Sequence, residues 1–495
     1  MFSRSSHFTI SGGTFNSIAR YISTLAHPSD CRRIPLGDID LQREIYVKDG
    51  SRIVYPCRRK QGLRRVYSAR VHESPSNFTA VVYEGEDAEK TWNEDVARYT
   101  SIRHPNVLQI FATAQTGNIH ATIFHGDIIP FKHFIELYRQ FPLLTVYIYA
   151  SIITEFKAVE NYFVSTFGCS LYDLQAMLLT RRSTGRLCTD ILASEASAYI
   201  YDAQPMLSDF EEIPSMINDS TQQSKIPESL SLTHYHEICH WYLGRSRFDW
   251  LPTRQAVNFG AILRWPLDQS LENATEIASL PSSTDFDFDM RWSWLGCTIQ
   301  NISYTMANGW IRISSKNALN KAETQAFSLN WQYENVWLTQ ANHIFAQGGI
   351  TSNLHEYAVL DSVRFWLKID PSRINPPQGY LFLCPAQHFH RGDPCHSFAW
   401  PECPAYWSLD PLGMDRLDEP SAAALGFPNL KFSTATWWRS WDGSVYTGLR
   451  QFHEGKGFDA ESEEVALHLG QPLYELSAGD LDDEYVYVEV EHLGK

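Results

Sequence analysis

A short histidine and glutamate motif in the middle of the chain could bind a metal ion. Residues His236-Glu-Ile-Cys-His240 match the pattern HExxH. On a helix this spacing places two imidazoles on one face, where they suit a tetrahedral zinc ion, and the glutamate between them can act as a general base. Apolar residues recur at helical intervals over Leu232–Leu243, which predicts that helix. One interpretation is therefore a zinc-dependent hydrolase with His236 and His240 as ligands and Glu237 as the base.

The motif alone does not complete a zinc site. No third histidine follows at the spacing of related metalloproteases, so a distant glutamate such as Glu272 or Glu276 would have to serve. The chain contains 18 histidines, which makes a chance match a serious competitor. A helix that packs its apolar stripe against a core explains the same residues without any metal.

Cysteine and histidine residues also cluster within a short stretch near the C-terminal end. Their spacing, C-x3-H-x-H-x4-C-H-x6-C, fits no standard zinc module, although four of them could converge on one ion. The simpler interpretation is a proline-rich loop with buried thiols, and a structural zinc site is the alternative. The residues are Cys384, His388, His390, Cys395, His396 and Cys403.

Two acidic motifs are weaker candidates for chemistry. Asp480-Leu-Asp-Asp483 matches the D-x-D-D acid motif of class II terpene cyclases, and the second half of the chain has aromatic residues that could surround a cation. The motif lies in an acidic tail, where a strongly raised carboxyl pKa is not expected. Asp285-Phe-Asp-Phe-Asp289 lacks a diphosphate-metal pattern. An enzyme acting on an apolar small molecule such as a terpenoid is therefore the weakest alternative.

Composition narrows the classes of partner. The 495 residues carry a formal net charge of -16, which argues against nucleic acid, because nucleic-acid affinity rests on basic side chains. No uncharged apolar run is long enough to span a membrane, and the longest, near Phe141–Ile153, suits a buried helix. Nine irregularly spaced cysteines indicate reduced thiols and a cytoplasmic protein. Residues 1–29 lack Asp and Glu, so mitochondrial import is the alternative location.

The first 200 residues predict a small sheet followed by helices. Alternating residues over Glu44–Val82 indicate an antiparallel meander, and Ala88–Ile102 has helical spacing. Two further strands are expected at Val107–Thr113 and Ile119–His125. Helices should follow at Phe131–Tyr138 and Leu143–Phe167.

This order of elements resembles the small lobe of a protein kinase. Val66-Tyr-Ser-Ala-Arg-Val71 looks like the second strand of that lobe, and Phe78-Thr-Ala-Val-Val-Tyr83 looks like the third. Ile102-Arg-His-Pro-Asn-Val107 matches the H-P-N turn that follows the lobe's helix and is the most specific part of the resemblance. Phe124–Ile135 resembles the hinge that leads into the large lobe.

The residues that transfer phosphate are absent from their expected places. The three loop glycines before Val66 are replaced by Arg59, Gln61 and Arg64, and Tyr83 stands where the third strand should carry its lysine. Asp95 stands where the helix should carry its glutamate. Neither an H-R-D motif with its asparagine nor a D-F-G motif follows the long apolar helix. The resemblance therefore implies a kinase-like fold that does not phosphorylate.

The second half differs sharply in composition. Fourteen of the fifteen tryptophans follow residue 240, and short strands are expected at Trp292–Ile299, Trp310–Ser314, Phe327–Trp337, Val363–Ile369 and Tyr380–Cys384. Helices are expected at Leu232–Leu243 and Glu461–Leu469. Strings such as Gly448-Leu-Arg-Gln-Phe-His453 resemble those of uncharacterised kinase-like proteins of mushroom-forming fungi, which implies no established activity.

The sequence thus predicts an α+β protein with two domains. We expect a leader at 1–35, a degenerate kinase-like domain at 36–200 with an antiparallel sheet, one helix and a helical continuation, and a linker at 201–230. A tryptophan-rich, mostly β domain should occupy 231–475, followed by an acidic tail at 476–495. The favoured function is a catalytically dead kinase-like binding or scaffold module. Its second domain would bind a protein partner or an apolar small molecule, with no membrane or nucleic-acid partner and no cofactor.

Overall fold

The computed structural model describes most of the chain as two compact units, Met1–Gln223 and Ser224–Lys495. Each unit combines helices with antiparallel sheets, so the protein is mixed α+β, as predicted. The division falls inside the predicted linker, and most of the predicted leader and acidic tail lies outside the described residues. The described residues are 31–48, 63–171, 177–191, 226–282, 284, 288–294, 303–318, 321–328, 332–369, 377–391 and 396–477.

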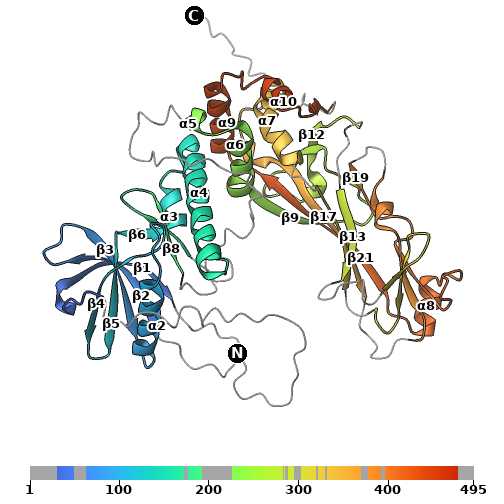
Figure 1. Cartoon of the computed structure of the whole chain (residues 1–495). Helices are drawn as coiled ribbons and strands as arrows, with labels where there is room; N and C mark the ends of the chain where they lie inside the picture. The colour runs from blue at the N-terminus through green and yellow to red at the C-terminus, as the bar shows by residue number, and fades with distance from the viewer. Residues whose placement is uncertain are drawn as a thin grey trace, which may run out of the picture. The chain divides into compact units, whose positions relative to one another are not determined.

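The first unit contains a five-stranded antiparallel sheet with the order β1-β2-β3-β5-β4 (Figure 1). Helix α2 (Ala88–Thr100) joins β3 to β4 and packs on β3 and β5. The predicted meander and helix are confirmed, and β4 begins three residues later than expected. The strands are β1 (Ile39–Lys48), β2 (Leu63–Val71), β3 (Asn77–Glu84), β4 (Ile110–Thr116) and β5 (Ile119–His125).

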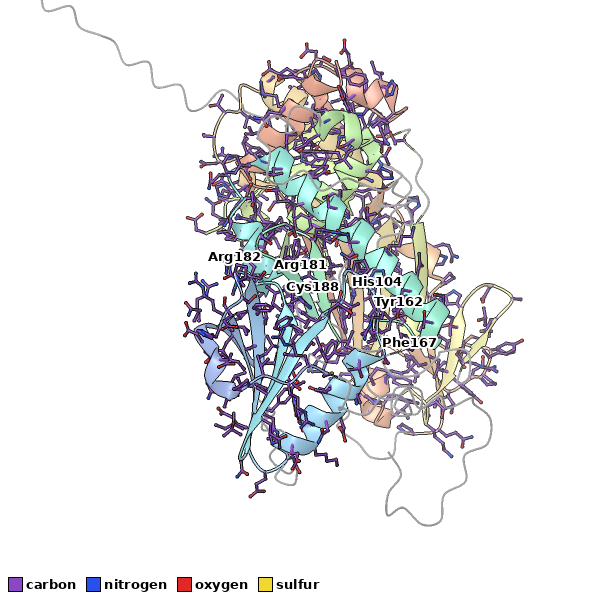
Figure 2. The ribbon with its side chains drawn as sticks, turned by 60° about the vertical axis from the view of Figure 1, so that its left-hand side comes forward. His104, Tyr162, Phe167, Arg181, Arg182 and Cys188 are labelled. Atoms are coloured by element: carbon purple, nitrogen blue, oxygen red, sulfur yellow. The ribbon has the colours of Figure 1, made fainter. Side chains whose placement is uncertain are left out.

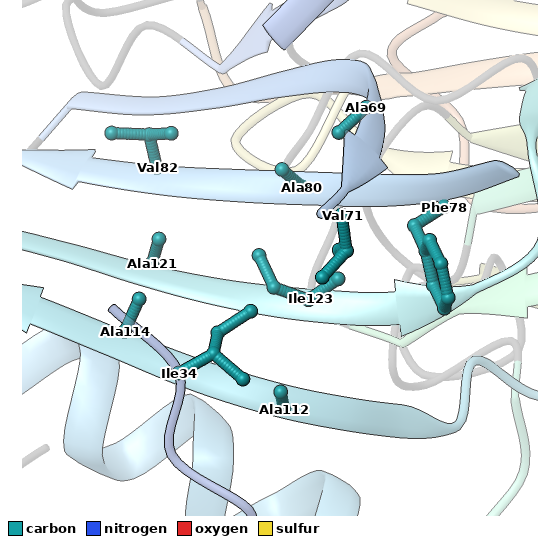
Figure 3. Close-up of a cluster of buried hydrophobic side chains, with 10 residues drawn as sticks. All are labelled: Ile34, Ala69, Val71, Phe78, Ala80, Val82, Ala112, Ala114, Ala121 and Ile123. Atoms are coloured by element: carbon teal, nitrogen blue, oxygen red, sulfur yellow. The ribbon is translucent and has the colours of Figure 1, made fainter. Parts of the chain in front are cut away.

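A cluster of small and branched apolar side chains fills one face of this sheet (Figure 3). Because successive strand residues point to opposite faces, the members from each strand are two positions apart. Ile34, which precedes β1, covers the cluster, and its backbone N–H bonds to the Thr113 carbonyl at 3.0 Å. The cluster comprises Ile34, Ala69, Val71, Phe78, Ala80, Val82, Ala112, Ala114, Ala121 and Ile123. The opposite face of the sheet is thereby left to α2.

A three-stranded sheet and two helices follow the five-stranded sheet. Strand β6 pairs with β7, and β7 forms a hairpin with β8. Helices α3 and α4 match the two predicted helices, and Pro142 occupies the first turn of α4, where its missing N–H costs no hydrogen bond. The elements are β6 (Ile128–Pro130), α3 (Phe131–Glu136), α4 (Pro142–Phe167), β7 (Met177–Arg181) and β8 (Leu187–Asp190).

Helix α4 is long and apolar enough, with a mean hydropathy of 1.2, to cross a membrane by length and composition. Packing within the protein gives another reason for this apolar composition, because half of the apolar window of α4 is buried. The Glu155 carboxylate on α4 accepts hydrogen bonds from the backbone N–H of Leu187 at 2.6 Å and from Arg186 at 2.8 Å. These contacts fix α4 against the β7–β8 hairpin, as expected of a core helix.

The second unit is built around an eight-stranded antiparallel sheet. Long strand β17 is its centre: it pairs with β11 and β16 along one edge and with β21 along the other, and β9 pairs with the far side of β21. The strands are β9 (Arg245–Leu251), β11 (Ala261–Arg264), β12 (Thr275–Ser279), β13 (Phe288–Trp294), β16 (Lys321–Ser328), β17 (Tyr357–Ile369), β21 (Leu430–Ser440) and β22 (Glu475–Leu476).

Smaller sheets and several helices complete this unit. A four-stranded sheet contains β14 (Ser303–Thr305), β15 (Ile311–Ser314), β18 (Tyr380–Leu383) and β20 (Ala405–Ser408), and β10 (Val257–Asn258) pairs with β19 (Ser397–Phe398). The helices are α5 (Ile226–Ser229), α6 (Leu232–Ile238), α7 (Gln332–Gln347), α8 (Glu419–Leu425), α9 (Gly443–Gly455) and α10 (Glu464–His468). A π-helical turn at Cys239–Leu243 extends α6.

The strand predicted at Phe327–Trp337 is wrong over most of its length. Strand β16 ends at Ser328, and α7 begins at Gln332. Val336, Trp337, Ala341 and Ile344 are fully buried at helical intervals, so the apolar residues form one face of a helix rather than the alternating pattern of a strand. The predicted helix Leu232–Leu243 is present as α6 and its π-helical extension.

Among the residues that the structure describes, seven tryptophans of the second unit are buried in its core. Trp337 and Trp441 are fully buried, and their indole N–H groups donate to the Tyr446 hydroxyl and to the Cys239 carbonyl at 3.2 and 3.0 Å. Burial of a large ring with its polar atom satisfied is a strong packing contribution. Trp250 on β9 differs, because 53% of it is exposed.

Candidate functional site

A buried polar cluster lies between the five-stranded sheet and helix α2 of the first unit. Arg64 on β2 stands directly opposite Tyr83 on β3. Asp95 and Tyr99 are four residues apart on α2 and therefore share one face of that helix. Asp190 is the last residue of β8. None of the five residues is more than 6% exposed, although three carry formal charges in their ordinary states.

Hydrogen bonds and ion pairs join the five residues. One guanidinium nitrogen of Arg64, Nη1, donates to Asp190 Oδ2 at 2.8 Å, and its Nε lies 3.8 Å from Asp95 Oδ2. The Tyr83 hydroxyl donates to Asp95 Oδ2 at 2.9 Å, and the Tyr99 hydroxyl donates to Asp190 Oδ1. One guanidinium thus lies between two carboxyl groups, and each carboxyl group also accepts a bond from a phenol. We call these five residues the Arg64 cluster.

Burial sets the protonation of the Arg64 cluster. It raises the pKa of Asp95, and Arg64 beside it offsets only part of that effect. Burial also holds the pKa of Tyr83 and of Tyr99 well above the usual value, so both phenols remain neutral donors. The primary ion pair is therefore between Arg64 and Asp190, which makes the shorter contact. A closed ion pair of this kind holds elements together and presents no group to solvent.

The turn that resembles the H-P-N motif fixes β8, and with it Asp190. The Asn106 side chain donates to the Leu187 carbonyl at 3.0 Å, while the Asn106 carbonyl accepts from Thr189 N–H at 2.7 Å. The His104 ring packs on Tyr162 of α4 with centroids 5.1 Å apart (Figure 2). The turn thereby connects α2, β8 and α4. It holds Asp190 at the end of β8 within hydrogen-bonding distance of Arg64 and Tyr99.

The segment after β5 has its backbone acceptors already in use. The His125 carbonyl accepts from Arg181 Nη1 at 2.9 Å, the Gly126 carbonyl from the Thr79 hydroxyl at 2.8 Å, and the Asp127 carbonyl from Arg182 N–H at 2.9 Å. Gly126 has a φ of +89°, and a Cβ there would lie 2.7 Å from Arg181 Nη1. The positive φ favours glycine at this position.

The first histidine of the HExxH motif lies beside a histidine from another helix. His236 Nε2 on α6 is 2.9 Å from His453 Nε2 on α9, and both side chains are buried. Burial lowers the pKa of His236 well below its usual value and that of His453 to about 4, so the two rings are neutral and one donates to the other. Tyr235 stacks on Phe452 one residue earlier on each helix, with centroids 3.9 Å apart.

The other two motif residues have different surroundings. His240 is buried in the π-helical turn, where burial and then Arg439 hold its pKa well below the usual value. Burial raises the pKa of Glu237 to about 7. Among the residues that the structure describes, no group of three or more His, Cys, Asp or Glu side chains is placed to hold a metal ion. The same statement covers the described members of the cysteine and histidine cluster.

Parts of three sequence motifs fall outside the part of the chain that the structure describes. Cys395 lies outside the described residues, as do Asp285, Asp287 and the D-x-D-D motif at 480–483. His396 packs closely on Gly260, where a Cβ would lie 2.4 Å from its ring. A core contact therefore accounts for the position of that histidine.

Sequence reasoning identified Tyr83 and Asp95 but missed the residues that complete their surroundings. It named Arg64 only as a replaced loop glycine and did not name Asp190. The only signal for Asp190 is a carboxylate directly after Leu187-Cys-Thr, and that pattern does not predict an arginine partner. His453 had no such signal, since it is separated from His236 by 217 residues. No protein-family model and no curated protein matches this chain.

Proposed function

We propose that the first unit is a kinase-like module that binds a partner without transferring phosphate, joined to an aromatic-rich second unit that binds a protein or an apolar small molecule. Support for the resemblance comes from the strand order β1-β2-β3-β5-β4, the helix between β3 and β4, and the H-P-N turn held against β8. The chain also resembles uncharacterised kinase-like proteins of mushroom-forming fungi, a resemblance that implies no established activity.

The observation that carries the proposal is the position of Arg64. In the resemblance it replaces the third glycine of the loop that should close over phosphates. Its guanidinium lies against Asp95 and Asp190, where a kinase would hold a lysine and metal ions near the phosphates. A cation supplied by the protein therefore compensates the carboxylates, which removes the attraction for a metal–phosphate complex.

The segment after β5 supports the same conclusion. A nucleotide base bound along the segment resembling the hinge needs free backbone groups, and the carbonyls of His125, Gly126 and Asp127 all accept bonds from the protein itself. These bonds and the Arg64–Asp190 ion pair support a module that does not use this segment to bind a nucleotide in the ordinary way.

Thermal unfolding with magnesium and ATP tests this proposal. A ligand present at 100 times its Kd would stabilise the native protein by about 2.7 kcal/mol. We expect no saturable rise in Tm with ATP, with or without Mg²⁺, up to millimolar concentrations. A saturable rise that the variant Asp190→Asn abolishes would contradict the proposal. The exposed variant Asp87→Asn, before α2, is the matched control.

The zinc-dependent hydrolase at His236, Glu237 and His240 is the second candidate function. One observation favours it: burial holds the pKa of Glu237 at about 7, near the value that suits a general base. Metal analysis of the purified protein tests it. About one zinc per chain, lost in His236→Ala and in His240→Ala but retained in His468→Ala, is the result that this alternative predicts. We expect zinc-free protein, because His236 is already paired with His453.

A further inference from the structure

Strand β9 forms an edge of the eight-stranded sheet (Figure 1). Among the residues that the structure describes, it pairs with β21 on one side and with no strand on the other. Its residues, Arg245–Leu251, pair with β21 without a bulge and include neither lysine nor proline. Bulges, lysines and prolines are the usual features that keep an edge strand from pairing with another chain. β9 is therefore a regular edge to which a further strand can be added.

Two exposed aromatic rings lie on this edge strand. Phe248 and Trp250 are 46% and 53% exposed. Their ring centroids are 5.4 Å apart, and the Phe248 centroid lies 5.2 Å from that of Trp437, which stands opposite Phe248 on β21. Alternate residues of a strand share one face of the sheet, so the three rings form one row that ends at the edge. An exposed aromatic row at the edge of a sheet marks an interaction surface.

The backbone groups of Ser246, Phe248 and Trp250 point away from β21. In an antiparallel pair, the N–H and C=O of every second residue face the neighbouring strand, and those of the residues between face the other way. The Asp249 carbonyl accepts from the Thr436 hydroxyl of β21 at 3.2 Å, whereas the Trp250 N–H donates to the Asp249 side chain at 2.8 Å. Asp249 therefore faces β21, and Trp250 and its alternate neighbours face outward.

A second copy of β9 matches this edge. Two copies of one strand can pair antiparallel about a twofold axis, which places one residue opposite itself. With Phe248 on the axis, Arg247 of each copy stands opposite Asp249 of the other. On the other face, Trp250 of each copy stands opposite Ser246, and the two Phe248 rings meet. This register combines opposite charges on one face of the sheet with a continuous aromatic row on the other.

The neighbouring registers bring like charges together. With Arg247 on the axis two arginines face each other, and with Asp249 on the axis two aspartates do. With Ser246 on the axis, Arg245 faces Arg247 of the second copy. Like charges directly opposite each other destabilise a sheet, whereas opposite charges stabilise it. Charge therefore selects the register centred on Phe248.

The backbone favours the same register. With Phe248 on the axis, the facing pairs of outward residues exchange about six hydrogen bonds, because each facing pair exchanges both of its N–H groups. The Trp250 N–H would turn from the Asp249 side chain to the Ser246 carbonyl of the second copy. An axis at Trp250 would instead bring Phe248 opposite Pro252, which has no N–H to donate.

The two charged side chains of this register already have uncharged partners. The Arg247 guanidinium donates to two backbone carbonyls and lies 3.7 Å from the centroid of the Trp265 ring. The Asp249 carboxylate accepts from the N–H groups of Trp250 and Leu271. Among the described residues, neither side chain forms an ion pair. Both charges therefore act on a facing strand while these contacts hold the side chains in place.

We propose that β9 pairs with β9 of a second copy of this chain, so that two eight-stranded sheets join edge to edge. The twofold axis passes through Phe248, and the aromatic row of one copy continues into that of the other. This inference goes beyond the proposed function, because it assigns the edge to self-association and holds whether or not the second unit binds another partner.

Sedimentation velocity of the full chain tests the proposal. Pairing through one strand buries little surface, so we expect a weak dimer that forms between about 1 and 100 µM. Phe248→Lys and Trp250→Lys should each weaken it at least about tenfold, because lysine on an edge strand opposes pairing. Tyr304→Lys, which changes a 59% exposed ring on β14, is the matched control and should leave the dimer unchanged. Far-UV circular dichroism checks that the variants fold.

Cysteine crosslinking tests the register. Phe248→Cys places two thiols opposite each other on the axis, within the reach of a disulfide, and should give a covalent dimer under mild oxidation. Trp250→Cys alone should not, because its two copies would be about 13 Å apart along the strands. A mixture of Trp250→Cys and Ser246→Cys chains should crosslink. The unaltered chain measures the background from its nine native cysteines.

Three outcomes would overturn the inference. The first is a chain that stays monomeric throughout this concentration range, and the second is a dimer that Trp250→Lys leaves intact. The third is crosslinking of Trp250→Cys alone as fast as that of Phe248→Cys, which would show a different register. A monomer whose Ser246 and Phe248 amides resist hydrogen exchange would likewise contradict it, since the chain itself would cover the edge. None of these results bears on nucleotide binding by the first unit.

Discussion

Replacing Arg64 by methionine is expected to lower the free energy of unfolding of the first unit by about 3–5 kcal/mol. Methionine has a similar length, so the loss comes from the charge and not from a cavity. It leaves Asp190 and Asp95 buried without their cation. Hydrogen–deuterium exchange of peptides from β2, α2 and β8 would measure the effect within the full chain.

The pH dependence of that loss separates charge from packing. In the Arg64→Met variant, the two carboxyl groups become protonated and neutral as pH falls. The loss in free energy of unfolding should therefore shrink towards pH 4. Arg70→Met, an exposed arginine on the same strand, is the matched control and should change stability little. A deficit that stays constant from pH 8 to pH 4 would show that Arg64 acts by packing alone.

The two aspartates of the cluster should respond differently to removal of their charge. Asp190→Asn removes the closest partner of Arg64 and should destabilise the first unit about as much as Arg64→Met. Asp95→Asn should cost about 1 kcal/mol or less, because burial already raises the pKa of Asp95 and an amide oxygen can still accept from the Tyr83 hydroxyl. Equal losses in the two variants would contradict the assignment of the primary ion pair.

Acid is expected to destabilise the second unit through the His236–His453 contact. Burial lowers the pKa of His453 from the usual 6.5 to about 4, so the folded state favours the neutral ring. Between those pH values the unfolded chain binds more protons. The contribution of this histidine is therefore complete above about pH 6.5 and is lost as pH falls towards 4. Its size is on the order of 3 kcal/mol.

Urea unfolding followed by tryptophan fluorescence measures this effect, because fourteen of the fifteen tryptophans follow residue 240 and report the second unit. His453→Gln removes the titrating ring and should flatten the decline in stability between pH 6.5 and pH 4.5. His468→Asn, which changes an exposed histidine of α10, should leave the decline unchanged. An equally steep decline in His453→Gln would assign the acid sensitivity to other groups.

The sequence predicted local features of this fold better than it predicted the candidate site. Helix α2 and strands β2, β3 and β5 follow from apolar periodicity, which depends only on neighbouring residues. The strand predicted at Phe327–Trp337 covers the first six residues of helix α7, because aromatic residues favour strands when short windows are considered. Periodicity gives the type of an element only where the pattern is long.

The contacts of the candidate site join residues that are far apart in the sequence. Local sequence patterns therefore did not predict them. Tyr83 and Asp95 were found by position within a resemblance. Arg64 and Asp190 are 126 residues apart, and neither belongs to a motif that predicts an ion pair. The resemblance showed which catalytic residues are missing, whereas only the fold shows that an arginine compensates the remaining carboxylates.

A phosphotransfer assay tests the central claim most directly. The full chain would be incubated with γ-labelled ATP and Mg²⁺, both alone and with generic protein substrates, and incorporation of label would be followed over time. The account predicts no incorporation above that of the Asp190→Asn variant. Robust incorporation that Asp190→Asn or Tyr83→Phe abolishes would contradict it, because it would show that the site opens, releases Arg64 and transfers phosphate.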